Sequence, residues 1–163
     1  MVTVLELRPF CRTDLDTVES WFADRDTAQH LGDREWPSEA LRLATVVVGQ
    51  TWAGVTTIRR QAFLAVDDRE GAVGLIDIEV YDDRTASYAF VVAPRLRRRG
   101  WGQAILRHTE ALSTLADVDT LIGQVATDNS ASIECLRKCG YTVAAEPDDQ
   151  GMLAVTKLHR SVT

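Results

Sequence analysis

The sequence is poor in cysteine, with three among 163 residues. So small and odd a number does not build a disulfide framework, which is typical of a reducing compartment. No run approaches the ~20 consecutive apolar residues that a bilayer-spanning helix needs. The first residues also lack the basic and apolar regions of a signal peptide. We therefore expect a cytoplasmic protein without a membrane partner.

Positive charge is also in deficit. Lysine and arginine total 18 against 24 acidic residues, a formal net charge of −6. A surface that coats nucleic acid needs net basic charge or a large basic face, so we expect no nucleic-acid partner. The hydrophobic fraction of 45% and charged fraction of 26% are ordinary for a globular protein. The length predicts one domain over residues 1–163.

Motifs for metal binding and for serine hydrolysis are missing. Cys135 and Cys139 lie one helical turn apart, but no further ligands complete a zinc set, so we expect no metal. The three histidines are scattered along the chain, and no Gly-x-Ser-x-Gly nucleophile motif is present. Neither class of enzyme is indicated.

The charges that are present are unevenly distributed. Residues 14–39 contain eight acids and two bases, whereas residues 95–107 contain five arginines and no acid. An acidic protein can thus carry a local site for an anion.

Hydrophobic periodicity predicts a mixed α/β domain. Turns at residues 67–71 and 82–84 indicate an antiparallel meander in the middle of the chain, and the alternation that follows requires crossover connections and some parallel pairing. The predicted strands are residues 2–8, 62–66, 72–81, 86–92, 120–126, 141–145 and 152–158, and the predicted helices are residues 14–22, 38–48, 103–115 and 129–139.

The basic segment lies between a predicted strand and a predicted helix. There the first helical amides lack partners and the helix dipole favours an anion, while Gly100 and Gly102 would let backbone approach a phosphate. The loop is not a Walker A motif, and Ile105 stands where a dinucleotide fingerprint needs its third glycine. The alternative interpretation is a solvated basic stripe.

Two motifs resemble those of the GCN5-related N-acetyltransferase superfamily. Arg97-x-x-Gly100-x-Gly102 is similar to its acyl-CoA signature, and residues 129–141 resemble its second motif, a helix that begins at Asn and ends at Gly-Tyr. The resemblance covers nearly the whole chain. It implies a mixed, mostly antiparallel twisted sheet flanked by helices, with a central parallel strand pair (86–92 and 120–126) that splays at the acyl-CoA site.

The resemblance implies acetyl-CoA as cosubstrate. Asn129 would contact the pantetheine or the diphosphate, and Arg97 opens the signature. The backbone of the strand before the loop would bind the pantetheine arm, through Phe90, Val91 and Val92. The pyrophosphate would lie on the amides of Arg98, Arg99, Gly100, Trp101, Gly102 and Gln103.

The chain departs from the superfamily at two positions. Many members carry a tyrosine general acid where this chain has Leu136, and some carry a glutamate where it has Gln124. The second motif resembles the branch that includes ribosomal-protein N-terminal acetyltransferases, where a serine near the sulfur can hydrogen-bond the leaving group. Ser132 is therefore a candidate catalytic residue and could equally be a polar residue of the first helical turn.

Candidate residues for the acceptor side lie on two neighbouring strands. Asp77 and Glu79 alternate on one face and are the available carboxylates for a base, although an exposed strand face explains them as well. Tyr88 is a further candidate to line the site. The reaction implied is direct attack of a neutral primary amine on the thioester in a ternary complex.

The acceptor is the least defined component. Residues 14–39 combine acids with Trp21, Phe22 and Trp36, which would suit a small cationic amine such as an aminosugar, or a peptide N-terminus. Alternatively these aromatics belong to the core. The chain would act as a monomer or homodimer. Leu136 and Gln124 leave open a non-catalytic acyl-CoA-binding regulatory module.

Overall fold

The computed structural model describes residues 4–32, 34–46, 49, 51–52 and 54–159. Its strands are β1 (Leu5–Pro9), β2 (Thr51–Trp52), β3 (Val55–Asp67), β4 (Gly71–Tyr81), β5 (Thr85–Val92), β6 (Thr120–Ala126), β7 (Thr142–Val143) and β8 (Met152–Leu158). Its α-helices are α1 (Leu15–Ser20), α2 (Arg25–Leu31), α3 (Trp36–Val46), α4 (Trp101–Glu110) and α5 (Ser130–Lys138). Short 3₁₀ turns are η1 (Arg12–Asp14), η2 (Trp21–Ala23), η3 (Pro94–Leu96) and η4 (Ser113–Leu115).

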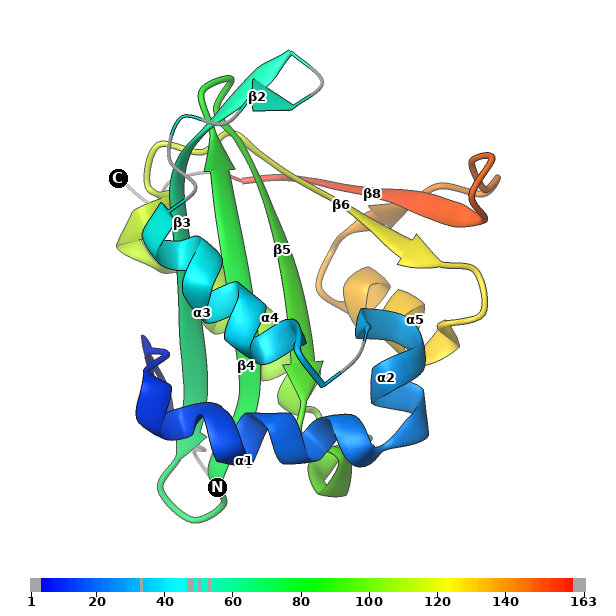
Figure 1. Cartoon of the computed structure of the whole chain (residues 1–163). Helices are drawn as coiled ribbons and strands as arrows, with labels where there is room; N and C mark the ends of the chain where they lie inside the picture. The colour runs from blue at the N-terminus through cyan, green and yellow to red at the C-terminus, as the bar shows by residue number, and fades with distance from the viewer. Residues whose placement is uncertain (1–3, 33, 47–48, 50, 53, 160–163) are drawn as a thin grey trace.

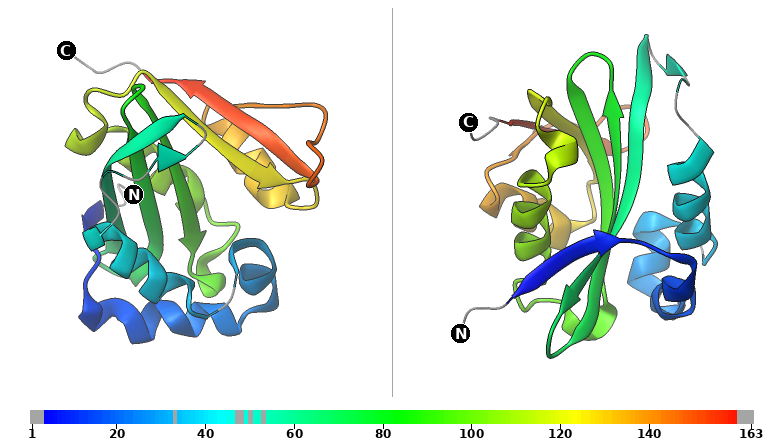
Figure 2. Two further views of the ribbon diagram at one scale, coloured as in Figure 1. Left: turned by 45° about the horizontal axis from the view of Figure 1, so that its top comes forward. Right: turned by 90° about the vertical axis from the view of Figure 1, so that its left-hand side faces the viewer.

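The strands form one sheet with the order β1-β3-β4-β5-β6-β8-β7, and β2 pairs with β3. Helices cover both faces: α1, α2 and α3 lie on one side, α4 and α5 on the other (Figure 2). Successive residues of β4 point to opposite faces, yet Leu75 and Ile76 are both fully buried. The core therefore lies on both sides of the central strands.

The parallel pair β5–β6 diverges after a short contact. The two strands pair only from Thr85 to Ser87 and from Thr120 to Ile122. Beyond Ser87, β5 stays paired with β4 as far as Val92, and β6 stays paired with β8 as far as Ala126. The strands thus open into a V (Figure 1). This arrangement confirms the predicted fold class, including the parallel pair that splays.

Several predicted elements have different bounds. β3 begins at Val55, seven residues before its predicted start at Ala62, because the polar run Arg59-Arg60-Gln61 and a register shift between Thr57 and Arg59 hide the strand pattern. The predicted helix 14–22 is shorter, since 3₁₀ turns flank α1. Residues 2–3 of the first predicted strand and 47–48 of the second predicted helix lie outside the described residues.

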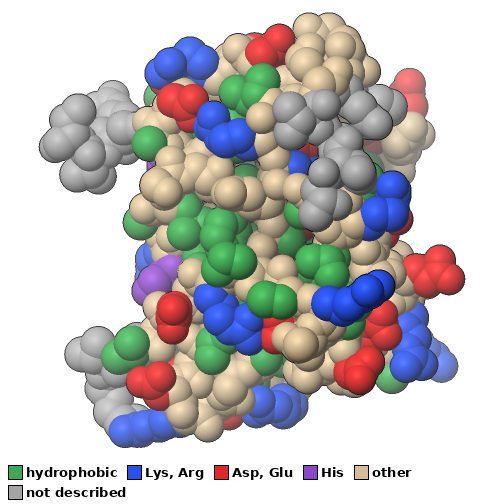
Figure 3. Space-filling model, turned by 60° about the vertical axis from the view of Figure 1, so that its left-hand side comes forward, with side chains coloured by type: hydrophobic (Ala, Val, Ile, Leu, Met, Phe, Trp, Pro, Cys, Tyr) green, Lys and Arg blue, Asp and Glu red, His purple; other side chains and the backbone are tan. Residues whose placement is uncertain are grey.

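The face formed by the β1 and β3 edge carries hydrophobic side chains in its centre, with charged side chains around them (Figure 3). Ile58 of β3 is one of the large apolar residues exposed to solvent, at 37%. Among the described residues, every helix is too short or too polar to cross a bilayer.

Candidate functional site

The loop after β5 ends at the start of α4 in a conformation suited to an anion. Gly100 is the N-cap of α4, with a left-handed φ of 85°, and has no side chain to satisfy the helix amides. The first bond into this end runs from the amide of Ala104 to the carbonyl of Gly100. Within the described part of the chain, the amides of residues 101–103 therefore have no acceptor, which leaves them available to a phosphate.

Three of the arginines of this loop, Arg95, Arg98 and Arg99, differ in the contacts that they make. Arg98 is exposed, adopts a positive φ of 60°, and forms no hydrogen bond or ion pair with the residues that the structure describes. Arg99 pairs with Glu70 at 3.0 Å, and Arg95 pairs with the same carboxylate at 2.9 Å. Unlike Arg95 and Arg99, Arg98 is thus not held by a carboxylate at ion-pair distance among the described residues, which leaves its guanidinium able to contact a ligand.

Gly102 has a packing role that the sequence did not reveal. A Cβ at this position would lie 3.1 Å from Cys135 Sγ and within 4 Å of Phe90 and Val92. The glycine therefore lets α4 pack closely on α5 and β5. The space around a Cβ at Gly100 is open instead. The two glycines therefore have different surroundings, and the expectation that both let the backbone approach a phosphate stays a prediction.

Arg97 is engaged by the N-terminal acidic segment. Its Nη1 donates to Asp24 Oδ2 at 2.8 Å, and its Nη2 donates to Thr27 Oγ1. Asp24 is also the N-cap of α2 and accepts from the amide of Thr27 at 3.0 Å. That amide and the Arg97 guanidinium hold the pKa of Asp24 below its ordinary value. Sequence reasoning treated the acidic and basic segments separately and missed this contact.

The second motif forms the start of α5. Asn129 is the N-cap, and its Oδ1 accepts from the amide of Ser132 at 3.3 Å. Ser132 therefore lies in the first turn, next to Asn129. Leu136 is 7% exposed and packs in the core, so an aliphatic group fills the position of the missing tyrosine. Gln124 donates to Asp148 at 3.2 Å.

Asp77 and Glu79 lie on the face opposite to α4. A Cβ at Gly102 of α4 would contact Phe90, so the side chain of Phe90 faces α4. Asp77 pairs with Ala89, the neighbour of Phe90, whose side chain points the other way because strand side chains alternate. The two carboxylates therefore lie on the side of α1–α3, beside the point where β5 leaves β6.

Arg60 of β3 joins the two carboxylates. Its Nη2 donates to Asp77 Oδ2 at 2.7 Å, and its Nη1 lies 3.5 Å from Glu79 Oε2. Thr57 donates to the other oxygen of Glu79 at 2.6 Å. Asp77 is 7% exposed, which makes the interpretation as an exposed strand face wrong for this residue. Burial raises the pKa of Asp77, and Arg60 opposes that rise.

Two further polar residues, Tyr81 and Ser87, lie beside this position, and a third, Tyr88, lies behind it on the other face of the sheet. Tyr81 and Ser87 share a hydrogen bond of 2.9 Å on the same face as Glu79. Burial raises the pKa of the Tyr81 phenol. Tyr88 lies on the opposite face, where its ring meets Tyr141 edge-on, and its buried hydroxyl has no partner in the described structure. Since the parallel pairing of β5 with β6 ends at Ser87, Tyr88 is the first residue of β5 beyond it.

The aromatic residues of the acidic segment are mostly core. Trp21 and Phe22 are buried, and Trp36 packs against Phe22 with its ring centre 5.8 Å away. The alternative that assigned these side chains to the core is therefore correct for Trp21 and Phe22.

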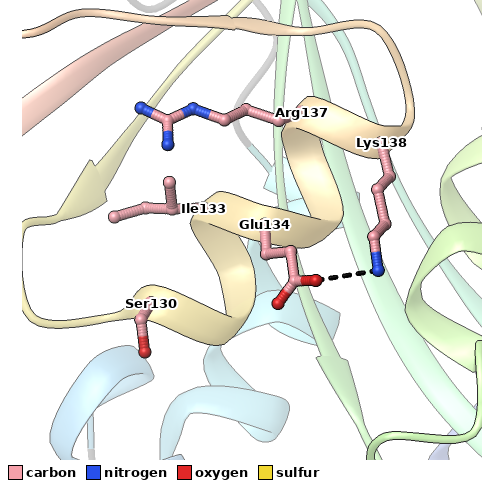
Figure 4. Close-up of a pocket in the computed structure, with 5 residues that line it drawn as sticks. All are labelled: Ser130, Ile133, Glu134, Arg137 and Lys138. Carbon is pink, nitrogen blue, oxygen red and sulfur yellow. Dashed lines mark ion pairs between the residues drawn. The ribbon is translucent and has the colours of Figure 1, made fainter.

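Surface grooves lie elsewhere. One runs along α5 and is lined by Ser130, Ile133, Glu134, Arg137 and Lys138, with a 2.8 Å pair between Glu134 and Lys138 (Figure 4). Another is lined by Thr17, Ser20, Trp21, Glu70, Ala72, Pro94 and Arg95. Neither lining contains a buried ionisable side chain. We therefore place the candidate site at the splayed strands, where the unpartnered amides and the buried carboxylate lie.

Comparison with known proteins agrees with this geometry. The family model described as "Acetyltransferase (GNAT) domain" matches residues 5–142. An uncharacterised N-acetyltransferase of Bacillus subtilis (strain 168), YfmK, is 23% identical over 143 residues, which cover 87% of this chain and 88% of the relative.

Two solved structures share the fold. A spermidine N-acetyltransferase from Vibrio cholerae, in complex with CoA and spermine, superposes with a TM-score of 0.75 at 15% identity, covering 96% of each chain. The aminoglycoside acetyltransferase AAC(6′)-Ib, in complex with coenzyme A, gives a TM-score of 0.74 at 15% identity, covering 97% of this chain and 96% of the other.

Proposed function

Because the chain belongs to the GNAT acetyltransferase family, we propose that it transfers the acetyl group of acetyl-CoA to the primary amine of a small cation that docks on the α1–α3 side of the sheet. The family makes it an acetyl-CoA-dependent N-acetyltransferase. The main support for an acceptor site on this side of the sheet is the buried carboxylate of Asp77, which lies beside the point where β5 and β6 separate.

On the cosubstrate side, the phosphates of acetyl-CoA would lie on the free amides of residues 101–103 and be contacted by Arg98. The pantetheine arm would run along the edge of β5 that β6 leaves open, from Tyr88 to Val92, where Phe90 and Val91 also lie. This course delivers the thioester to the V between the strands, with Ser132 and Asn129 on the β6 side.

On the acceptor side, local charge favours a cation. Asp77 and Glu79 share one arginine, so the three side chains have a formal net charge of −1. Buried or half-buried carboxylates attract an ammonium group more strongly than solvated ones. The two solved structures of similar fold are a spermidine and an aminoglycoside acetyltransferase, and both of these substrates carry several amino groups. An amine with more than one positive charge is therefore the acceptor class we propose.

The amine must lose a proton before it attacks. For an amine with a pKa near 10.4, the cost at pH 7 is about 4–5 kcal/mol, whereas for one near 8 it is about 1–1.5 kcal/mol. Burial raises the pKa of Asp77, which makes it a stronger base than an exposed aspartate. We assign Asp77 the role of accepting this proton, directly or through water, and Glu79 the role of holding the ammonium form.

The test is a panel of amines assayed by release of CoA thiol. Polyamines and aminosugars should react, and amines that carry no second positive charge should react poorly. Asp77→Asn should lower kcat/KM by about 10²-fold or more, since proton transfer by a positioned side chain contributes that much. Asp68→Asn, a matched change in the exposed turn before β4, should have no effect. Unchanged kinetics in the Asp77 variant would rule out the assigned role.

A second candidate function is a non-catalytic acyl-CoA-binding module, which the buried Leu136 favours because it cannot donate a proton to the leaving thiolate. The same panel separates the two functions. A module of this kind would bind acetyl-CoA without releasing thiol in the presence of any amine.

A further inference from the structure

Helix α2 touches both of the loops that carry the two CoA motifs. At its start, Asp24 accepts from Arg97 at 2.8 Å, and Arg97 also donates to Thr27 Oγ1. Thr27 is 2% exposed, whereas the side chains of Arg97 and Asp24 are 32% and 34% exposed, so the contact is partly buried. Arg97 belongs to the loop after β5, three residues before the N-cap of α4. The N-terminal end of α2 is therefore held against the loop between β5 and α4.

The other end of α2 touches the loop after β6. Gln29 donates through Nε2 to Asp128 Oδ2 at 3.0 Å, and His30 Nε2 lies 3.4 Å from Asp128 Oδ1. Asp128 directly precedes Asn129, the N-cap of α5. Within seven helical residues, α2 thus spans from one CoA motif to the other (Figure 1).

The sheet itself does not set the distance between these loops. β5 and β6 share three paired positions, all at the end remote from Arg97 and Asp128. On one side of the opening, α4 and α5 pack together through Gly102 and Cys135. On the opposite side, α2 joins the two loops through its contacts with Arg97 and Asp128. Without them, thermal motion could widen the V, because no strand pairing opposes it.

We propose that α2 sets the width of the acyl-CoA opening by holding Arg97 and Asp128, so that the two CoA motifs face one ligand at the same time. Gln29 and Asp128 act as positioning residues that need not touch the cosubstrate. This inference rests on the proposed function, because it concerns the same acetyl-CoA site. It goes beyond that function by assigning a role in cosubstrate affinity to a helix that lies on the acceptor side.

The test exchanges the donor and the acceptor across the Gln29–Asp128 contact. Gln29→Glu sets two carboxylates against each other and should weaken CoA binding about threefold to tenfold, the range for an exposed charge contact that turns repulsive. Adding Asp128→Asn restores one donor and one acceptor, and should bring the affinity back to within about twofold of the wild type. Binding of CoA is measured by titration calorimetry.

Arg25→Gln is the matched control, since it makes the exposed surface of the same helix more negative by the same one charge without touching either loop. It should leave CoA affinity unchanged. In the acetyl-transfer assay, Gln29→Glu should raise the KM for acetyl-CoA and leave kcat within about twofold, and the double variant should recover the KM.

The outcomes separate this inference from the proposed function. A wild-type chain that does not bind CoA would overturn both. A wild-type chain that binds, with Gln29→Glu binding equally well, would overturn the role of α2 alone. So would a double variant that binds as weakly as Gln29→Glu, because a loss that the exchange cannot repair arises from the substitution itself and not from the contact.

Discussion

Arg97 and Asp24 join the most basic and the most acidic segments of the chain, with Nη1 of the arginine 2.8 Å from Oδ2 of the aspartate. The contact connects residues 73 positions apart in sequence. The acidic segment therefore does more than offset the charge of the basic loop, because Asp24 holds that loop in place. Arg97, the first residue of the CoA signature, already has Asp24 and Thr27 as its partners.

The Asp24 contact should contribute stability that depends on pH. Asparagine still caps a helix, so Asp24→Asn removes the charge and keeps the cap. The native pKa of Asp24 is lowered, so its contribution is fully present above the ordinary value of 3.8 and disappears as pH falls through the native pKa. We expect a loss of up to about 1 kcal/mol at neutral pH that shrinks in acid.

Denaturant unfolding across this pH range measures the effect. Asp26→Asn is the control, because Asp26 is 76% exposed and lies 3.9 Å from the same guanidinium. Equal losses in the two variants at neutral pH would show that general charge, rather than the Asp24–Arg97 contact, is responsible.

A second prediction concerns the packing of Gly102. In Gly102→Ala the new methyl group would meet Cys135 Sγ at 3.1 Å, and overpacking of this kind costs about 1–3 kcal/mol. Alanine also favours a helix over glycine by about 1 kcal/mol. In the Cys135→Ala background the sulfur is gone, so the same substitution should be neutral or stabilising. Thermal unfolding of the wild type, the two single variants and the double variant measures the effect, and an identical change in both backgrounds would contradict the packing role.

A third prediction concerns Arg98. The positive φ of Arg98 is strained for a residue with a Cβ, so glycine would relieve that strain. Glycine also loses more conformational entropy on folding, which opposes the gain. The two effects offset each other, so Arg98→Gly should change the free energy of unfolding by less than about 1 kcal/mol. The lost guanidinium should weaken CoA binding about tenfold, as for a hydrogen bond to a charged group. Arg95→Ala, which removes an arginine paired with Glu70, should leave the affinity unchanged. Equal affinities of wild type and Arg98→Gly would exclude a phosphate contact.

The sequence allowed the central strands to be predicted well. β6 and β8 have the bounds that periodicity indicated, because apolar and polar side chains alternate along each strand and turn residues flank it. The prediction of a splayed parallel pair came from the family resemblance, and the register of β5 with β6 confirms it.

Features set by tertiary contacts could not be predicted. α2 has a polar sequence with little helical periodicity, and its cap and its contacts with Arg97 and Asp128 stabilise it. The burial of Asp77 depends on Arg60, which the polar start of β3 concealed. The assignments of individual residues to CoA or to the acceptor remain predictions for experiment.

The most direct test of the central claim is a titration of the ¹⁵N-labelled protein with CoA, followed by amide NMR. The account places the phosphates on the loop before α4, so the amides of residues 98–103 should shift most, with Asn129 and its neighbours next. The exposed turn at residues 82–84, at the other end of β5, should not shift. Saturable binding that leaves the amides of residues 98–103 unmoved would contradict the account, as would the absence of binding at millimolar CoA.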